Sequence, residues 1–339
     1  MSRNPSLAVA TELSTAVRGT RFLGLVADQL AATEDLIRLK IGSDIPFITD
    51  ASEYIFNGGG KRVRPALLLL SSKMLGNPGD EDVTYAAVIE FIHTATLVHD
   101  DIIDDSKLRR GQSTVHNVWD NSQTVLLGDW LYTTSMKMAL GHDRLDVVRK
   151  LCEATLRMTE GELMVLDRLG ALNVSREEYF DIIERKTAFL FSAACSIPAL
   201  AGGSETERTA LDDYGRALGL CFQLVDDLLD FTESEASLGK PALSDLKGGK
   251  LTLPLILLLP RLDSGRKRWI EWVLEDRDFS RVEPQQILEL VTSTGIVEEV
   301  RELAESYASA ARKALQGLPA GEARDALEFA PEFVLNRRS

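Results

Sequence analysis

Two groups of aspartates carry most of the chemistry that this 339-residue chain offers. The stretch "HDDIIDD" at 99–105 is answered by "VDDLLDF" at 225–231. Each copy has three aspartates at the same spacing, 126 positions apart: Asp100, Asp101 and Asp104 in the first, and Asp226, Asp227 and Asp230 in the second. Neighbouring carboxylates repel each other, so these side chains are either solvated or neutralised by a bound cation.

Both groups suit a site for a hard divalent metal ion. Residues four apart on a helix lie about 5–6 Å from each other, so Asp100 and Asp104 point the same way, with Asp101 to one side. Mg²⁺ prefers oxygen ligands and commonly joins one or two carboxylates to the phosphate oxygens of a substrate. The alternative is an exposed, solvated acidic helix end. The apolar surroundings, "ATLVHDDII" and "FQLVDDLLDF", and the matched second copy favour the metal site.

Basic residues near these groups indicate a polyanionic ligand. "NGGGKRVRP" at 57–65 places Lys61, Arg62 and Arg64 after three glycines, close to Pro65 at a predicted helix start. Such a loop lets the backbone approach an anion, although by itself it also fits a solvated turn. It is not a G-x-x-x-x-G-K-[ST] phosphate loop. Further cations follow at Arg109, Arg110, Lys186, Lys240 and Lys250. Metal-bound diphosphate accounts for this mixture of acids and cations.

Two polar residues precede the acidic groups on the same helical patterns. His93 lies seven residues before Asp100, two turns away on the same face, so it either faces the same cavity or is a hydrogen-bonded core residue. Gln223 precedes Asp226 by three residues and either orients a ligand or bonds within its helix.

The elements that must position these residues are almost all predicted helices. Apolar residues recur at three- and four-residue spacing through most of the chain, and strand signals are nearly absent. Besides helices near 22–42, 64–77 and 81–105, the pattern predicts helices over 122–140, 144–169, 175–201, 206–232, 281–294 and 296–316. The breaks between them are short, so we expect one all-helical domain over 21–339, with residues 1–20 disordered.

Composition excludes several other classes of protein. The net charge of −14 argues against nucleic acid or an anionic membrane as a default partner. Cys152, Cys195 and Cys221 lie in apolar surroundings and are predicted to be small buried residues in a reducing compartment. There is no signal-peptide pattern, and the longest apolar run, "LTLPLILLL", is too short to span a membrane. We therefore expect a cytoplasmic protein with at most transient membrane contact.

With these residues assembled, the chain resembles the trans-isoprenyl diphosphate synthases. The family's landmarks appear in order as "GGGKRVRP", "IHTATLVHDDIIDDSKLRRG", "GDWLYTTS", "ERKTAFLF", "GLCFQLVDDLLDF" and "GKPALSDLKGGKLTLP", with a weaker match at the end, "EFVLNRRS". The resemblance implies an all-α, isoprenoid-synthase-type helical bundle around a central cavity, usually a homodimer, with three Mg²⁺ ions.

The resemblance also implies roles for individual residues. Isopentenyl diphosphate would be held by Lys61, Arg64, His93 and Arg110. The metal ligands would be Asp100, Asp104 and Asp226, with Asp101 and Asp227 supporting them and Asp105 solvated. The allylic diphosphate and leaving-group side would be lined by Arg109, Lys186, Thr187, Gln223, Lys240 and Lys250.

The implied reaction needs no side-chain nucleophile. The allylic C–O bond ionises as metal and cations stabilise the departing diphosphate, and the double bond of isopentenyl diphosphate attacks the resulting carbocation. Loss of a proton gives a trans product that is one isoprene unit longer. An apolar cavity keeps water away from the cation. No convincing Ser/His or Cys/His arrangement competes with this scheme.

Product length should depend on what blocks the cavity below the first aspartates. Bulky aromatics four or five residues before the first Asp stop the chain early in the family, and here those positions are the small Thr96 and Ala95. Phe91 lies about one turn deeper and either limits the product or packs in the core. We expect hexaprenyl to decaprenyl products, with octaprenyl as the central expectation and geranylgeranyl as the alternative.

Two other functions share part of the pattern. A class I terpene cyclase also ionises an allylic diphosphate, but it normally lacks the second aspartate group and the glycine–lysine–arginine loop. A regulatory subunit of a heteromeric synthase would be expected to have lost acids or cations from the motifs, and none is missing here.

Overall fold

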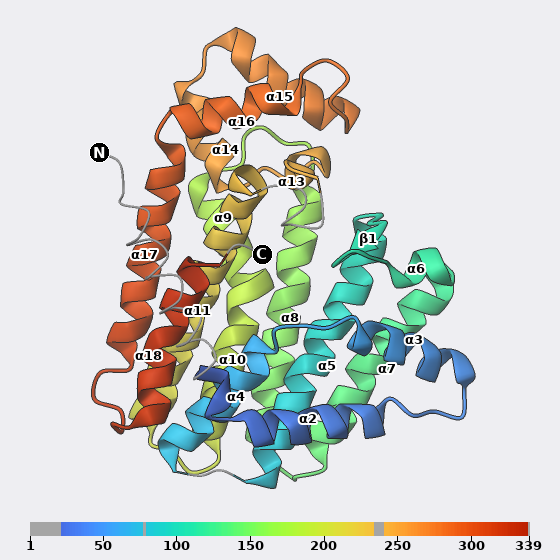
Figure 1. Ribbon diagram of the computed structural model, residues 1–339, viewed down its shortest axis with the longest axis vertical. Helices are drawn as coiled ribbons and strands as arrows, with labels where there is room; N and C mark the ends of the chain where they lie inside the picture. Colours follow the sequence, from blue (N-terminus) through green and yellow to red (C-terminus); the bar gives the residue numbers. More distant parts are fainter. Residues whose placement is uncertain (1–21, 77–78, 234–240, 338–339) are drawn as a thin grey trace.

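The computed structural model describes residues 22–76, 79–233 and 241–337. Helices make up almost all of its regular structure (Figure 1). The α-helices are α2 (Ala27–Lys40), α3 (Pro46–Asn57), α4 (Val63–Leu75), α5 (Asp80–Ile103), α6 (Val115–Val118), α7 (Asn121–Leu140), α8 (Leu145–Asp167), α9 (Arg176–Ile183), α10 (Phe189–Leu200), α11 (Glu205–Thr232), α13 (Ser244–Lys247), α14 (Leu253–Leu258), α15 (Ser264–Asp276), α16 (Pro284–Ser293), α17 (Ile296–Ala314) and α18 (Glu322–Leu335).

Four short elements interrupt this pattern of α-helices. A π-helical segment, η1 (Glu184–Ala188), joins α9 to α10, and a 3₁₀ turn, η2 (Leu259–Arg261), follows α14. The antiparallel strands β1 (Leu108–Arg109) and β2 (Gln112–Ser113) form a small hairpin after α5.

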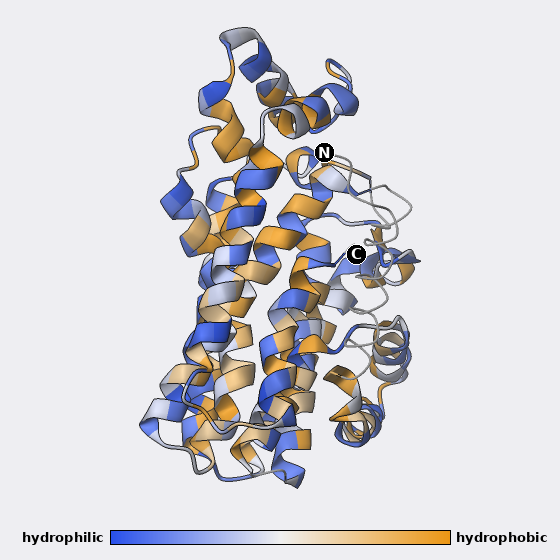
Figure 2. Cartoon of the chain, turned by 60° about the vertical axis from the view of Figure 1, so that its left-hand side comes forward, coloured by the Kyte–Doolittle hydropathy of each residue, from blue (hydrophilic) through white to orange (hydrophobic). Residues whose placement is uncertain are grey.

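The long helices run side by side and form a bundle. In Figure 1, α5, α8, α10 and α11 lie roughly parallel to its long axis, α2 crosses the lower end, and α15 and α16 cover the upper end. Hydrophobic and hydrophilic residues alternate along these helices in Figure 2. This is the pattern expected when one face of each helix is buried.

The longest helix, α11, shows how local sequence and packing cooperate. Ser204 caps its N-terminus by accepting a hydrogen bond from the Glu207 N–H, while Glu207 accepts one from the Ser204 N–H at 2.7 Å, which is a capping box. Further along, a Cβ on Gly219 would lie 2.6 Å from the Cα of Ala188. Glycine at this position therefore lets α11 approach η1 closely enough for side chains from both elements to meet.

The predicted all-α fold class is confirmed, and most of the predicted helices match observed ones within a few residues. Six helices were not among the predicted ranges: α3, α6, α13, α14, α15 and α18. The helix predicted over 175–201 is interrupted by η1, which has five residues and wider π-type turns. The helix predicted to start at Pro65 begins at Val63, so the proline lies within its first turn.

Four further predictions concern the N-terminal residues, Lys240, the number of domains and the cysteines. Residues 1–20 and Lys240 lie outside the described residues, and the single domain over 21–339 stays a prediction. All three cysteines are free, but Cys152 is exposed, so the prediction that it is buried was wrong. Its neighbours Leu151 and Ala154 are buried, so Cys152 lies on the opposite, outward face of α8.

Across residues 22–76, 79–233 and 241–337, no helix is both long and apolar enough to cross a membrane.

Candidate active site

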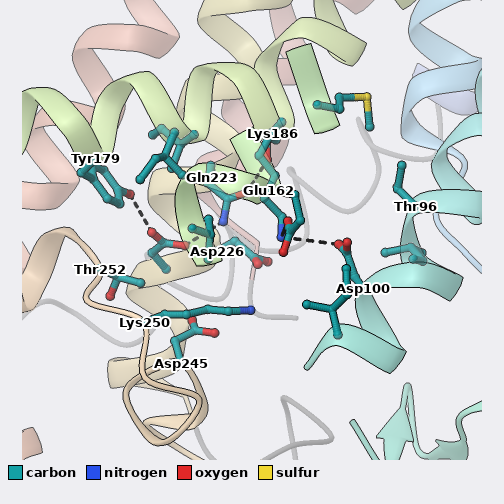
Figure 3. Close-up of a pocket in the computed structure, with 18 of the residues that line it drawn as sticks. Thr96, Asp100, Glu162, Tyr179, Lys186, Gln223, Asp226, Asp245, Lys250 and Thr252 are labelled. Atoms are coloured by element: carbon teal, nitrogen blue, oxygen red, sulfur yellow. Dashed lines mark hydrogen bonds and ion pairs between the residues drawn. The ribbon is translucent and has the colours of Figure 1, made fainter. Parts of the chain in front are cut away.

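A cavity of about 440 Å³ lies between α5, α8, η1 and α11, and the loop before α14 closes it. Figure 3 shows Asp100 on α5 and Asp226 on α11 at opposite walls, with Lys186 and Glu162 between them. The cavity brings together eleven of the predicted site residues: Arg64, His93, Thr96, Asp100, Arg109, Lys186, Thr187, Gln223, Asp226, Asp227 and Lys250.

Asp100 belongs to a charged cluster that joins three helical elements. The Lys186 ammonium lies 3.5 Å from Asp100 Oδ2 and donates to Glu162 on α8. The pKa of Asp100 is raised to about 6, chiefly by burial; Lys186 lowers it, and Glu162 and Asp104 raise it. Burial alone would lower the pKa of Lys186, but Asp100 and Glu162 raise it above its usual value. Two carboxylates therefore share one cation, and this arrangement favours a further positive ligand.

The other aspartates of this group have separate partners. Asp104 accepts a hydrogen bond of 2.7 Å from Lys250 on the loop before α14. Asp101 is buried and pairs with Arg109 at 2.7 Å, so it holds the hairpin against α5. Asp105 is 78% exposed and pairs with Lys107 and, at 3.9 Å, with His116 Nε2. Within this group, therefore, Asp100 and Asp104 are the aspartates paired with lysines from the opposite wall.

On the facing wall, Asp227 is the centre of a hydrogen-bond chain. Tyr179 donates to it at 2.6 Å and the Gln223 amide donates at 2.7 Å, while Thr187 donates to Gln223 at 2.8 Å. Burial and then the nearby Asp245 raise the pKa of Asp227 to about 8. The chain fixes the side chains of Gln223 and Thr187 at the edge of the cavity.

Asp230, the third aspartate of the second group, is fully buried. It accepts hydrogen bonds from the Ser244 hydroxyl at 2.9 Å and from the backbone N–H groups of Ser244 and Asp245 at 3.2 Å. Asp230 thus holds the segment that leads to Lys250, unlike its sequence counterpart Asp104. The two groups match in spacing but differ in what their third aspartate does.

Asp226 lies opposite the C-terminal end of the chain. Arg337 reaches it at 3.4 Å, and the same guanidinium lies 4.6 Å from the centre of the Phe222 ring. The ring therefore supports a cation whose charge balances Asp226.

A second group of cations lies next to this wall. The Arg64 guanidinium stacks 4.3 Å from the Phe191 ring and lies 3.3 Å from His93 Nε2. Burial, with a contribution from Arg337, lowers the pKa of Arg64 to about 10. Burial and then Arg337 also lower the pKa of Lys61. Burial together with the surrounding arginines lowers the pKa of His93 well below its usual value, so its imidazole is neutral.

Arg110 lies slightly apart from these cations. It donates to the carbonyl oxygen of Gly59 and lines a second, smaller cavity of about 60 Å³ behind the first. Arg109 and Leu97 line both cavities. Close packing of like charges in this region favours the binding of an anion.

The π-helical segment positions the two residues that link the walls. It changes the register of the helix at Lys186 and Thr187, and π-helical turns are frequent at functional sites. Gly161 on α8 allows this approach, because a Cβ there would lie 2.7 Å from the Lys186 backbone nitrogen. Glu162, the next residue, is thereby brought to the Lys186 ammonium.

The predicted chain-length residues lie in different places. Thr96 lines the cavity, one turn or about 6 Å below Asp100 along α5. Ala95 is buried and does not line the cavity. Phe91 is fully buried, with its ring centre 5.4 Å from that of Phe56, and is also outside the cavity lining.

The donor set suits a divalent metal ion bound together with a ligand. Within the described part of the chain, no three His, Cys, Asp or Glu side chains converge to form a metal site by themselves. Single carboxylates instead face the cavity from two walls. Mg²⁺ is commonly bound in this way, through one or two carboxylates, waters and substrate phosphate oxygens.

Sequence reasoning missed three residues that complete the site: Glu162, Tyr179 and Arg337. Tyr179 lies in an ordinary amphipathic helix and Glu162 in an acidic stretch, "EGE", so neither had a signal that pointed to the cavity. Arg337 lies in the basic ending "NRRS", but only the fold brings it to Asp226.

Comparison with known proteins identifies the family to which the chain belongs. The family model for polyprenyl synthetase matches residues 45–291. The octaprenyl diphosphate synthase of Escherichia coli (strain K12) is 39% identical over 305 residues, which cover 89% of this chain and 94% of that protein. A short chain isoprenyl diphosphate synthase of Methanothermobacter thermautotrophicus is 36% identical, covering 92% of this chain and 98% of that protein.

A solved structure agrees with the fold over nearly its whole length. The polyprenyl synthase from Caulobacter crescentus CB15, complexed with calcium and isoprenyl diphosphate, superposes with a TM-score of 0.91 at 36% identity. The match covers 95% of this chain and 98% of that one.

The lowered pKa of His93 leads to a prediction about acid stability. An unfolded histidine takes up a proton near pH 6.5, whereas the folded His93 does so only at lower pH, so stability should fall as the pH drops below about 6.5. His93→Gln should reduce this loss. Urea denaturation at about pH 7.5 and about pH 5.5 measures the difference, and an equal loss in both proteins would contradict a neutral His93.

Proposed function

Because the chain belongs to the polyprenyl synthetase family, we propose that it condenses isopentenyl diphosphate with an allylic diphosphate. The product is a medium-to-long trans-polyprenyl diphosphate, and free diphosphate is released. One observation carries the proposal: aspartates on α5 and α11 face one cavity, where each lies beside a cation from another segment.

The allylic diphosphate is placed between the two aspartate walls. Lys186, Lys250 and Arg109 supply positive charge there, and Gln223 and Thr187 supply polar groups held by Asp227 and Tyr179. Lys240 is assigned to the same side by family resemblance alone. Asp100, Asp104 and Asp226 are the proposed metal ligands, with Mg²⁺, three ions in all, as the proposed metal.

Isopentenyl diphosphate is placed beside the second group of cations. Lys61, Arg64 and Arg110 would bind its diphosphate, and Arg337 lies close enough to Lys61 and Arg64 to affect the pKa of both. The neutral His93 can form a hydrogen bond to the diphosphate without adding a positive charge to the site. The fixed position of this group relative to the cavity orients the double bond toward the allylic carbon.

The chain's own residues support ionisation and then protect the cation. When bound, divalent ions neutralise the diphosphate and favour its departure. Lys186 and Lys250 stabilise the same charge from the protein side. The allylic C–O bond breaks, the new C–C bond forms, and a proton leaves to the released diphosphate. Apolar residues in the lining, including Met158 and Ile183, help to exclude water.

The proposed product is hexaprenyl to decaprenyl, with octaprenyl most consistent with the relative from Escherichia coli. The short-chain relative keeps geranylgeranyl as the alternative. Thr96 lines the cavity on the side below Asp100, and its small side chain leaves that direction open.

The proposed assembly is a homodimer that buries an outward face of α7 and α8. Leucines on α8 are exposed at regular spacing: Leu156 is 59% and Leu163 is 57% exposed, and Leu126 on α7 is 65% exposed. Tyr132 on α7 and Thr155 on α8 lie 3.3 Å apart between their oxygens, which joins the two helices. An apolar patch of this kind is typical of a surface that another chain covers.

The reaction itself is tested with purified protein, Mg²⁺, isopentenyl diphosphate and geranyl or farnesyl diphosphate as primer. We expect elongation that EDTA abolishes. Asp100→Asn and Asp226→Asn should each lose about 100-fold or more in rate, whereas the control Asp105→Asn, whose side chain is 78% exposed, should keep wild-type activity. The absence of elongation in the wild-type protein would refute the proposed function.

Product length is tested by blocking the cavity below Asp100. Thr96→Phe should shorten the products, because Thr96 lines the cavity, and chromatography after phosphatase treatment measures the shift. Phe91→Ala should leave the length unchanged if Phe91 only packs against Phe56. Products of wild-type length from Thr96→Phe would show that the floor lies elsewhere.

The dimer is tested by sedimentation velocity. We expect the wild-type protein to sediment as a dimer and the double variant Leu156→Glu, Leu163→Glu as a monomer, because charge cannot be buried there without a partner. Leu39→Glu on α2, where the leucine is 73% exposed, is the matched control and should remain dimeric. A monomeric wild type would contradict the assembly.

A further inference from the structure

The loop before α4 and the first turn of α4 contain three cations in four positions, and the structure separates their roles. Arg62 lies between Lys61 and Arg64 but is engaged on the other side. Its Nε donates to Glu34 and its Nη1 to Glu90, both at 2.5 Å, and its Nη2 donates to the Phe56 carbonyl oxygen at 3.3 Å. One guanidinium therefore joins α2, the end of α3 and α5.

These contacts leave Arg62 little capacity for a ligand. All three of its nitrogens already donate to protein oxygens, and only 14% of its side chain is exposed. Arg62 lines the smaller cavity together with Arg110 but not the larger one, and Lys61 is in the lining of neither. Its two carboxylate partners also compensate its charge.

The backbone at Arg62 explains why such strong contacts are needed. Its φ is +46°, in the left-handed region that a non-glycine residue rarely adopts. This residue is the N-cap of α4, so its conformation sets the direction in which the chain enters the helix that carries Arg64. Gly60 packs beside it, with a Cβ there lying 3.0 Å from Arg62 Nη1.

Residues on two successive turns of α5 contact Arg62 and Arg64. Glu90 holds Arg62, and His93, one turn further along, lies 3.3 Å from Arg64. Glu90 is only 5% exposed, and its charge acts against burial by raising the pKa of Arg62, Arg64 and Arg110. A single buried carboxylate thus offsets part of the repulsion among these three arginines, although burial still lowers the pKa of Arg64 and Arg110 overall.

We propose that Arg62, held by Glu34 and Glu90, is a positioning residue for the isopentenyl diphosphate site and does not itself bind the diphosphate. The proposal rests on the proposed function, which places Lys61 and Arg64 on that ligand. Arg62 fixes the left-handed turn, and the turn places the two neighbouring cations. The allylic site on the opposite wall does not depend on this contact.

The test compares the two substrates in steady-state kinetics of Glu34→Gln, Glu90→Gln and Arg62→Lys. We expect the KM for isopentenyl diphosphate to rise about tenfold, with the KM for the allylic primer and kcat within about twofold of wild type. Asp35→Asn is the matched control, because Asp35 adjoins Glu34 but forms an exposed pair with Arg38. It should leave every constant unchanged.

A double variant separates positioning from direct binding. If Arg62 acts through its carboxylate partners, Arg62→Met combined with Glu90→Gln should be no worse than Arg62→Met alone. A loss of isopentenyl diphosphate binding in Arg62→Met, with Glu34→Gln and Glu90→Gln unaffected, would make Arg62 a direct ligand and overturn the proposal.

The remaining outcomes are also distinguishable. Equal rises in both KM values, or unchanged values in all variants, would overturn the positioning role while leaving the enzyme assignment intact. Glu34→Gln changes a carboxylate whose side chain is 29% exposed, so this variant is expected to fold. Its KM values test the positioning role even if the other variants do not fold. A wild-type protein that fails to elongate any primer refutes the proposed function instead.

Discussion

The cavity must hold charges of both signs before any ligand arrives, and this requirement accounts for most of its contacts. A carboxylate or ammonium removed from water is costly unless it is paired. Asp100 is paired with Lys186, Asp104 with Lys250, and Asp226 with Arg337, each from a different segment. The Asp100 side chain is 19% exposed and that of Asp226 is 45% exposed, so burial makes pairing most necessary at Asp100. In the proposed function, metal and diphosphate replace these contacts with equivalent ones.

Close approach of helices makes this pairing possible. The π-helical segment η1 can lie against both α8 and α11 because Gly161 and Gly219 have no side chains there. Lys186 then reaches Glu162 on one side, and Thr187 reaches Gln223 on the other. Backbone packing outside the cavity thus decides which polar groups meet inside it, because a displacement of even about one ångström would break hydrogen bonds of this length.

The two aspartate groups share a spacing but have different environments. Asp104 is paired at the cavity edge, whereas Asp230 is buried and caps the segment that leads to Lys250. Asp101 holds the hairpin through Arg109, and Asp227 holds Tyr179 and Gln223. Some of these aspartates therefore pair or hydrogen-bond with protein groups that shape the site, and the remaining ones face the ligand. Similarly, one arginine of the glycine-rich loop supports the cations on either side of it.

Sequence alone determined the helical fold class, the two aspartate groups and the cations that follow them. These features are local, because helical periodicity and carboxylate spacing depend on residues a few positions apart. Tertiary structure decided which of them share a cavity. It separated Arg62 from Arg64, placed Phe91 against Phe56, and brought Arg337 to Asp226 from more than a hundred residues away. Such contacts depend on how the helices pack against each other. The spacing of residues within one helix does not specify which helix packs beside it.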